Sequence, residues 1–220
     1  MLKKVALVVL VLAALAFFAT RTPEVPPGFV SLRESPTFQS AALLEKAWAL
    51  PVAAKYPRPL LSQTNPTSCG PTSVANVLRS GGEPTTPSEL AAHGPGCVNG
   101  FCFGGLTLDD LAEASQESSS VWKVTVVRPE TVEALRDELR HANDPSVRLV
   151  ANFHRGPLFG TGGGHHSPIG GFLEEEDLVF VLDVNASYGP WLVPTPRLFE
   201  AMNTVDSSSG SKRGLIIFRR

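Results

Sequence analysis

One cysteine, Cys69, stands in a setting that favours nucleophilic chemistry. It ends the turn-rich stretch SQTNPTSC, directly before a segment over 71–79 that is predicted to be helical. A thiol at a helix N-terminus is exposed to the positive ends of backbone N–H groups, which favour the thiolate. Gly70 lets a substrate approach the backbone closely. The alternative is a buried apolar cysteine, and the polar turn residues around Cys69 argue against it.

Acyl transfer by a thiolate also needs a base, a group that orients the base, and donors for the oxyanion. His165 in GTGGGHHSP is the base candidate, and His166 competes, because neighbouring residues at a strand start point to opposite sides. Asp183 ends the apolar run LVFVLD, where a buried carboxylate needs a partner such as His165. A turn-initiating aspartate is the alternative. Gln63 is a candidate oxyanion donor beside the backbone N–H of Cys69.

The other two cysteines, Cys97 and Cys102, lie close together in the glycine-rich stretch GPGCVNGFCFGG. A disulfide between them would leave Cys69 free, whereas two free buried thiols or a weak metal site are the alternatives. A catalytic metal is disfavoured, because adjacent histidines seldom bind one ion well and the sequence contains no C-x-x-C or H-E-x-x-H motif. We therefore expect no metal ligands.

Periodicity and turn residues predict the elements that must position these side chains. Predicted helices are 40–50, 71–79, 86–93, 107–117, 129–141 and 194–203, and predicted strands are 122–127, 148–154, 168–173, 178–184 and 215–218. A short strand over 56–61 is weakly indicated, because prolines interrupt it. Helices dominate the first half and strands the second, which predicts an α+β fold with the helical first half packed on an antiparallel sheet.

The N-terminus carries a targeting signal, because Lys3 and Lys4 precede an apolar run over 5–18. Residues 1–20 are predicted to be a signal peptide or an N-terminal membrane anchor, 21–35 a Pro-rich linker and 36–220 the catalytic domain. The domain is thus expected to be exported, either periplasmic or anchored to the bacterial inner membrane facing the periplasm. A formal net charge of −2 and scattered Lys and Arg argue against a nucleic-acid partner.

The order of these motifs resembles the phytochelatin synthase family in its short prokaryotic form. The matching segments are QTNPTSCG, GLTLDDLA, VANFHR, GGHHSP, VLDV and AMNTVDSSSGSKRGLIIF. The resemblance runs from Gln63 to the C-terminus, with 84–147 only loosely similar. It implies a papain-like fold with a triad of Cys69, His165 and Asp183, and with Gln63 in the oxyanion hole.

The resemblance also implies an activity. Family members remove glycine from glutathione through a γ-glutamylcysteinyl thioester, and pass the acyl group to water or to a second glutathione, which gives phytochelatin. Arg213 would clamp the α-carboxylate of the γ-glutamyl group and Asp206 its α-ammonium, with Gly164 and Asn152 lining the same site. No cofactor is required. A heavy-metal ion (Cd or Zn) bound as a thiolate complex of the substrate, and a homodimer, are left open.

Two departures from the family pattern favour hydrolysis over polymerisation. Ala186 lies near the place where the family usually has an arginine, in a stretch with one residue fewer, and the chain reaches Arg220 without the Cys-rich C-terminal region of the plant enzymes. Two rival functions remain: a papain-like cysteine peptidase acting on other peptides, and a non-catalytic exported thiol- or metal-binding module. The pair Asp206 and Arg213 argues against the peptidase, because it suits a free amino-acid head rather than an internal peptide.

Overall fold

The computed structural model describes residues 28–220, so the predicted signal segment 1–20 and the first part of the predicted linker lie outside the described residues. A compact unit spans Ser31–Arg220. Its first element, the 3₁₀-helix η1 (Leu32–Glu34), buries Leu32 completely. The folded domain therefore begins a few residues before position 36, where the sequence analysis placed its start, because the side chain of Leu32 belongs to the core.

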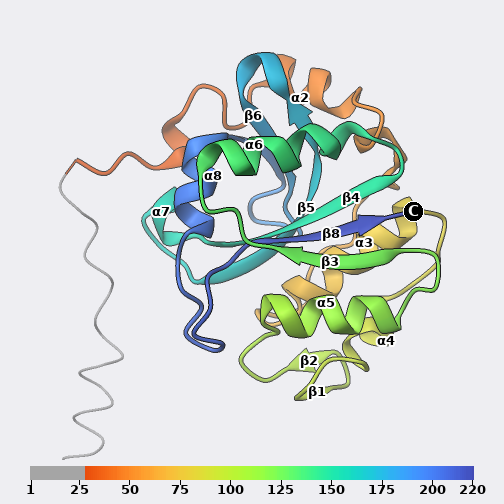
Figure 1. Cartoon of the computed structure of the whole chain (residues 1–220). Helices are drawn as coiled ribbons and strands as arrows, with labels where there is room; N and C mark the ends of the chain where they lie inside the picture. Colours follow the sequence, from red (N-terminus) through yellow and green to blue (C-terminus); the bar gives the residue numbers. More distant parts are fainter. Residues whose placement is uncertain (1–27) are drawn as a thin grey trace, which may run out of the picture. The chain divides into compact units, whose positions relative to one another are not determined.

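A six-stranded, fully antiparallel sheet in the order β3-β8-β4-β5-β6-β7 forms the centre of this unit (Figure 1). The strands are β3 (Lys123–Val127), β4 (Val147–His154), β5 (Gly164–Leu173), β6 (Leu178–Leu182), β7 (Pro190–Pro194) and β8 (Leu215–Arg219). Five of them match predicted strands. The edge strand β7 was missed, because proline at both of its ends argues against a strand in sequence.

Helices from the first half of the chain cover one face of the sheet, as predicted. They are α2 (Ala41–Trp48), α3 (Cys69–Ser80), α4 (Pro87–Ala91) and α5 (Leu108–Glu117). Their apolar side chains share one core with Val150, Phe180 and Ile216 of the sheet. The long helix α3 packs against β5, which brings its first residue to the start of that strand.

Helices from the second half cover the opposite face, where Figure 1 shows α6 and α8 on the other side of the sheet from α5. They are α6 (Val132–Arg140), α7 (Gly156–Phe159) and α8 (Thr195–Met202). The packing of first-half helices alone is therefore an incomplete description. Every residue of β6 is buried, so both faces of the sheet need an apolar cover. The short helix α7 was not predicted, because a single turn shows no periodicity.

Two loop regions near α3 have structure of their own. The weakly indicated strand over 56–61 is absent; instead, the side-chain amide of Asn76 bonds both the N–H and the C=O of Leu61 at 2.9 Å. Farther on, β1 (Cys97–Val98) and β2 (Phe101–Cys102) form a small hairpin joined by a disulfide between Cys97 and Cys102. Within residues 28–220, no helix is long and apolar enough to cross a bilayer.

Candidate active site

Cys69 is the first residue of α3 and lines a cavity of about 180 Å³. The disulfide takes up the other two cysteines, so Cys69 is the free one, and it is 8% exposed. The rest of the cavity wall comes from loops and from the strands β4 and β5: Pro66, Thr67, Gly104, Gly105, Leu106, Asn152, Gly164, His166, Asp206, Ser207, Ser208 and Arg213. The thiol thus lies at a helix N-terminus beside a small polar cavity, in the position that its sequence context predicts.

Both histidines lie inside β5, because this strand begins at Gly164 rather than at the predicted position 168. His165 pairs with Phe153 of β4 and His166 with Asn152, so the two side chains leave the strand on opposite sides, although both imidazoles reach the thiol of Cys69. Each is nevertheless buried, with exposed fractions of 4% and 3%. Because helices cover both faces, neither ring is left to the solvent.

The ring of His165 is held by a buried carboxylate. Its Nε2 lies 3.0 Å from Oδ1 of Asp183 and 3.0 Å from Oγ of Ser167. The side chain of Asp183 has no exposed surface, and it also accepts hydrogen bonds from Nη2 of Arg155 at 2.9 and 2.8 Å and from Nε1 of Trp191 at 2.9 Å. With donors on both oxygens, the carboxylate stays ionised and fixes the imidazole.

Sequence reasoning did not identify Arg155 or Trp191 as partners of Asp183. Arg155 follows β4 directly, and its guanidinium carbon lies 3.8 Å from the centroid of the Tyr188 ring. These contacts join three different strands and loops, and no spacing in the sequence announces them. A weak signal is present, since an arginine directly after an apolar strand is costly to bury without an acidic partner.

The charges in this cluster support a thiolate–imidazolium pair. Burial raises the pKa of the Cys69 thiol, but hydrogen bonds and charge from His165, and then from His166, lower this pKa well below its usual range. Burial lowers the pKa of His165, whereas Asp183 and Cys69 raise it, with a net rise. For Asp183, burial is outweighed by His165 and Arg155, and its pKa falls to about 2. Nδ1 of His166 lies 4.0 Å from Sγ of Cys69.

The four residues predicted to bind substrate all line the same cavity as Cys69. Nη1 of Arg213 donates to Oδ2 of Asp206 at 2.9 Å and to Oδ1 of Asn152 at 3.2 Å. Gly164 makes room for this guanidinium, because a Cβ at position 164 would lie 2.5 Å from Nη1 of Arg213. The amide Nδ2 of Asn152 in turn donates to the backbone carbonyl of His165 at 3.2 Å, which links this wall to β5.

Gln63 is not among the residues that line the cavity. Its backbone N–H donates to the carbonyl of Val184 at 2.8 Å, and its side-chain Nε2 donates to the carbonyl of Asn65 at 3.1 Å. Its part in an oxyanion hole therefore stays a prediction. Within residues 28–220, no group of three or more His, Cys, Asp and Glu side chains is arranged to hold a metal ion.

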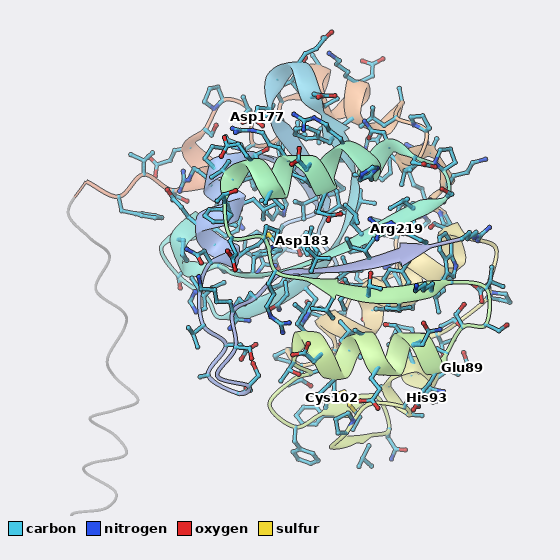
Figure 2. All side chains as sticks on the ribbon, in the orientation of Figure 1. Glu89, His93, Cys102, Asp177, Asp183 and Arg219 are labelled. Carbon is cyan, nitrogen blue, oxygen red and sulfur yellow. A yellow bond between two sulfur atoms is a disulfide. The ribbon has the colours of Figure 1, made fainter. Side chains whose placement is uncertain are left out.

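The disulfide hairpin supports the loop that leads into Cys69. Nδ2 of Asn65 donates to the carbonyl of Gly100 at 3.3 Å, and the N–H of Cys102 donates to Oγ1 of Thr67 at 3.2 Å. Figure 2 shows Cys102 in this hairpin, next to α5 and distant from Asp183. The cross-link thus lies behind the cavity wall and takes no part in the chemistry at the thiol.

The chain is similar in sequence to a family described as phytochelatin synthase and to several glutathione gamma-glutamylcysteinyltransferases. The sequence profile of the family described as phytochelatin synthase matches residues 102–215. Glutathione gamma-glutamylcysteinyltransferase 1 of Triticum aestivum is 42% identical over 82 residues, which cover 37% of this chain and 16% of the relative. Glutathione gamma-glutamylcysteinyltransferase 3 of Lotus japonicus is 41% identical over 92 residues, which cover 41% of this chain and 19% of the relative. The chain thus aligns with less than a fifth of each relative's length.

A solved structure shows the same fold. A C39-like peptidase from Bacillus anthracis superposes with a TM-score of 0.51 at 16% identity, over 74% of this chain and 94% of the peptidase. At this identity the likeness concerns the fold alone. The predicted papain-like arrangement of helices on an antiparallel sheet is therefore confirmed.

Proposed function

This chain belongs to the phytochelatin synthase family, and from that premise we propose that it is an acyltransferase in which Cys69 cleaves glutathione to γ-glutamylcysteine and glycine. One observation carries the proposal: a single cavity is lined both by the free thiol and by the ion pair of Arg213 and Asp206. One small peptide could therefore contact both the reactive sulfur and the charged pair that suits its free amino-acid end.

The γ-glutamyl end of glutathione suits the pair on the cavity wall. Its α-carboxylate can take two parallel hydrogen bonds from the guanidinium of Arg213, while its α-ammonium bonds the carboxylate of Asp206. Both side chains are largely buried, with exposed fractions of 6% and 15%. Charge pairing is strengthened in such a setting, because little water competes for either partner.

With the head group held, the Cys69 thiolate attacks the carbonyl carbon of the Cys–Gly amide. The carbon–nitrogen bond breaks, and the imidazolium of His165 gives its proton to the departing amine of glycine. A γ-glutamylcysteinyl thioester remains on the sulfur. Asp183 keeps the ring of His165 in the orientation needed for this transfer and stabilises its charged form.

The thioester is then attacked by water or by the amine of a second glutathione, and His165 takes the proton of the attacking group. Release of the acyl group restores the thiolate. We propose that hydrolysis is the main outcome, since Ala186 gives no cationic side chain near the place where the family usually has an arginine. A heavy-metal ion would enter as part of the substrate, bound to its thiolate.

Brief exposure of the purified protein to glutathione tests the substrate and the nucleophile together. We expect release of glycine and a mass increase equal to one γ-glutamylcysteinyl group on Cys69, with neither in a Cys69→Ala variant. A second assay, with glutathione and Cd²⁺, compares γ-glutamylcysteine with phytochelatin. Phytochelatin formed as fast as γ-glutamylcysteine would refute the preference for hydrolysis, and a protein that releases no glycine would refute the substrate.

The Arg213→Ala variant distinguishes this function from that of a general peptidase. We expect it to lose glutathione turnover, because the head group loses its main cationic partner. If the variant turned glutathione over normally and the wild-type protein also cut casein, a papain-like peptidase would be the better description. A protein that cleaved neither substrate, and whose Cys69 reacted with iodoacetamide no faster than free cysteine, would point to a thiol-binding module.

We also propose that the domain acts outside the bacterial cytoplasm. The disulfide between Cys97 and Cys102 supports this location, because such bonds persist mainly in oxidising compartments. The basic and apolar residues at the N-terminus support it independently. Fractionation of cells that produce the full chain should recover it from the periplasm or the inner membrane, and recovery in the cytoplasm with three free thiols would contradict export.

A further inference from the structure

His166 is a second imidazole beside the proposed nucleophile, and the triad gives it no function. Its Nδ1 lies 4.0 Å from Sγ of Cys69, which is the outer limit of a hydrogen bond to sulfur. The ring also lines the cavity, and its residue is 3% exposed. A buried polar ring in contact with the reacting atom needs an account of its own.

Ser73 and Asn152 contact His166 from two sides. Oγ of Ser73 on α3 donates to the backbone carbonyl of His166 at 2.9 Å, which joins the helix that carries the thiol to β5. On the other side, Nδ2 of Asn152 lies 3.5 Å from Nδ1, too far for a strong bond. The amide of Asn152 is itself held by Arg213 and by the carbonyl of His165. The backbone of His166 is therefore tied to α3, and Nδ1 of its ring lies beside both the amide of Asn152 and the sulfur of Cys69.

The position of the ring proton follows from the partners of its two nitrogens. Among the described residues, no acidic side chain bonds His166, and a neutral imidazole carries a single N–H, on either Nδ1 or Nε2. Nε2 is buried and has no hydrogen-bond partner in the described part of the chain. A proton there would bury a donor without an acceptor, whereas a proton on Nδ1 faces the sulfur of Cys69 and leaves the amide Nδ2 of Asn152 to donate to the carbonyl of His165.

We propose that His166 donates a hydrogen bond from Nδ1 to the Cys69 thiolate, as a second donor that stabilises the nucleophile beside His165. The different roles of His165 and His166 follow from the residues that each of them bonds. His165, held by Asp183, carries the proton that moves during the reaction, whereas His166 keeps its proton and contributes only a dipole. The inference rests on the proposed role of Cys69 as nucleophile and does not depend on glutathione as the substrate.

The pH dependence of Cys69 alkylation by iodoacetamide reads the thiolate directly, without any substrate. Several charged or titratable groups surround the thiol and stay constant in the test: His165 on β5, Arg213 and Asp206 across the cavity, and Asp183 and Arg155 behind His165. Only position 166 is changed. The disulfide leaves Cys69 as the free cysteine, so alkylation reports on one sulfur.

Three variants separate hydrogen-bond donation from packing. The amide nitrogen of asparagine can stand where Nδ1 lies, and that of glutamine where Nε2 lies, whereas phenylalanine fills the space without a donor. We expect His166→Phe and His166→Gln to shift the alkylation profile up by about one pH unit, so that the rate at any pH on the acid limb of the profile falls about tenfold. His166→Asn should keep most of the wild-type rate. His93→Asn, on the surface beside Glu117, is the matched control and should change nothing.

Two outcomes would overturn the proposal. If the pH profiles of the wild type and the three position-166 variants superimpose, His166 makes no hydrogen bond to the sulfur. If the three variants shift by the same amount, only the packing of the ring matters. Circular dichroism identifies any variant that fails to fold; if His166→Phe does so, the comparison of Asn with Gln decides alone. Glutathione turnover is measured separately. A profile that shifts as expected in a protein that releases no glycine would refute the proposed substrate and leave this inference standing.

Discussion

At the scale of single residues, Asp183 is the most constrained group of the site. Its carboxylate has no exposed surface and accepts hydrogen bonds from the side chains of His165, Arg155 and Trp191 and from the N–H of Asn185. Such a group can neither rotate nor take up a proton without breaking several bonds. The orientation of His165 is therefore settled before any substrate arrives, which lowers the reorganisation needed during the reaction.

Replacement of Asp183 by asparagine tests this role. The amide keeps the size of the side chain but removes the charge that stabilises imidazolium, so kcat should fall by roughly three to four orders of magnitude. The measurement is glycine release from glutathione by the folded variant. Asp177→Asn is a matched control, since Asp177 pairs with Arg136 away from the site and has a φ of 52°, which asparagine tolerates. Equal activity of both variants would contradict the role of Asp183.

The same carboxylate should make stability depend on acid pH. Its pKa is about 2 in the folded chain against an ordinary value of 3.8, so its ionised form favours the folded state. This contribution, on the order of 2 kcal/mol, is fully present above pH ~4 and is lost as the pH falls through about 2. Urea unfolding from pH 7 to pH 2 should show a steeper loss for the wild type than for Asp183→Asn. Parallel curves would exclude the effect.

At the scale of elements, the start of β5 must bring backbone close to a guanidinium. Gly164 allows this approach, whereas a methyl group there would lie 2.5 Å from Nη1 of Arg213. Gly164→Ala should displace the guanidinium and raise the KM for glutathione about tenfold, with little change in kcat, which corresponds to ~1.4 kcal/mol of binding.

The neighbouring Gly163 provides the control for this prediction. A Cβ at position 163 would meet nothing within 4 Å, so Gly163→Ala should keep the wild-type KM. Steady-state kinetics of the two variants decides. If both raise KM alike, the effect would come from stiffening of the loop rather than from contact with Arg213.

The disulfide hairpin is the second element with a testable role. Cys97→Ser removes the cross-link while Cys102, which is completely buried, stays unchanged. Closure of so short a loop is worth about 2 kcal/mol, and the variant should lose that much in urea unfolding without reductant. Reductant should lower the wild type to the same level and leave the variant unchanged. Val98→Ser, at a position 60% exposed, should match the wild type.

At the scale of the whole molecule, two apolar cores share one sheet. Residues of β6 alternate between them, with Val179 and Val181 in one core and Phe180 in the other. Loss of packing in one core should therefore also destabilise the core on the opposite face of the sheet, because the same strands contribute side chains to both. We expect the unit Ser31–Arg220 to unfold in one step.

Phe180→Ala tests this coupling. Phe180 is completely buried and meets the ring of Trp48 edge to face, so its loss should cost about 3–5 kcal/mol. Hydrogen exchange should show α3 and α8, on opposite faces, losing protection by the same amount. Protection kept in α8 but lost in α3 would mean that the two faces open separately. Phe103→Ala, at a position 71% exposed, should leave both unchanged.

The parts of this molecule that the sequence predicts are those with a local pattern. Helix α5 and strand β4 follow from spacing and caps, and Cys69 from its turn-rich helix start. Contacts between residues that only strand pairing brings together could not be predicted from the sequence. Arg155 and Trp191 meet Asp183 only because three strands converge. The start of β5 at Gly164 was hidden as well, since glycines argue against a strand until the pairing of His165 with Phe153 is known.

The ion pair of Arg213 and Asp206 has a consequence for which molecules can enter. The two charges neutralise each other, and both side chains are largely shielded from water. A ligand with a single charge would bind one member of the pair and leave the other buried without a counter-ion. A zwitterion replaces both counter-ions at once, with its carboxylate on Arg213 and its ammonium on Asp206. Acetylation of the α-amine or amidation of the α-carboxylate should therefore prevent an amino acid from binding. The cavity thus distinguishes a free amino-acid group from a residue within a protein chain.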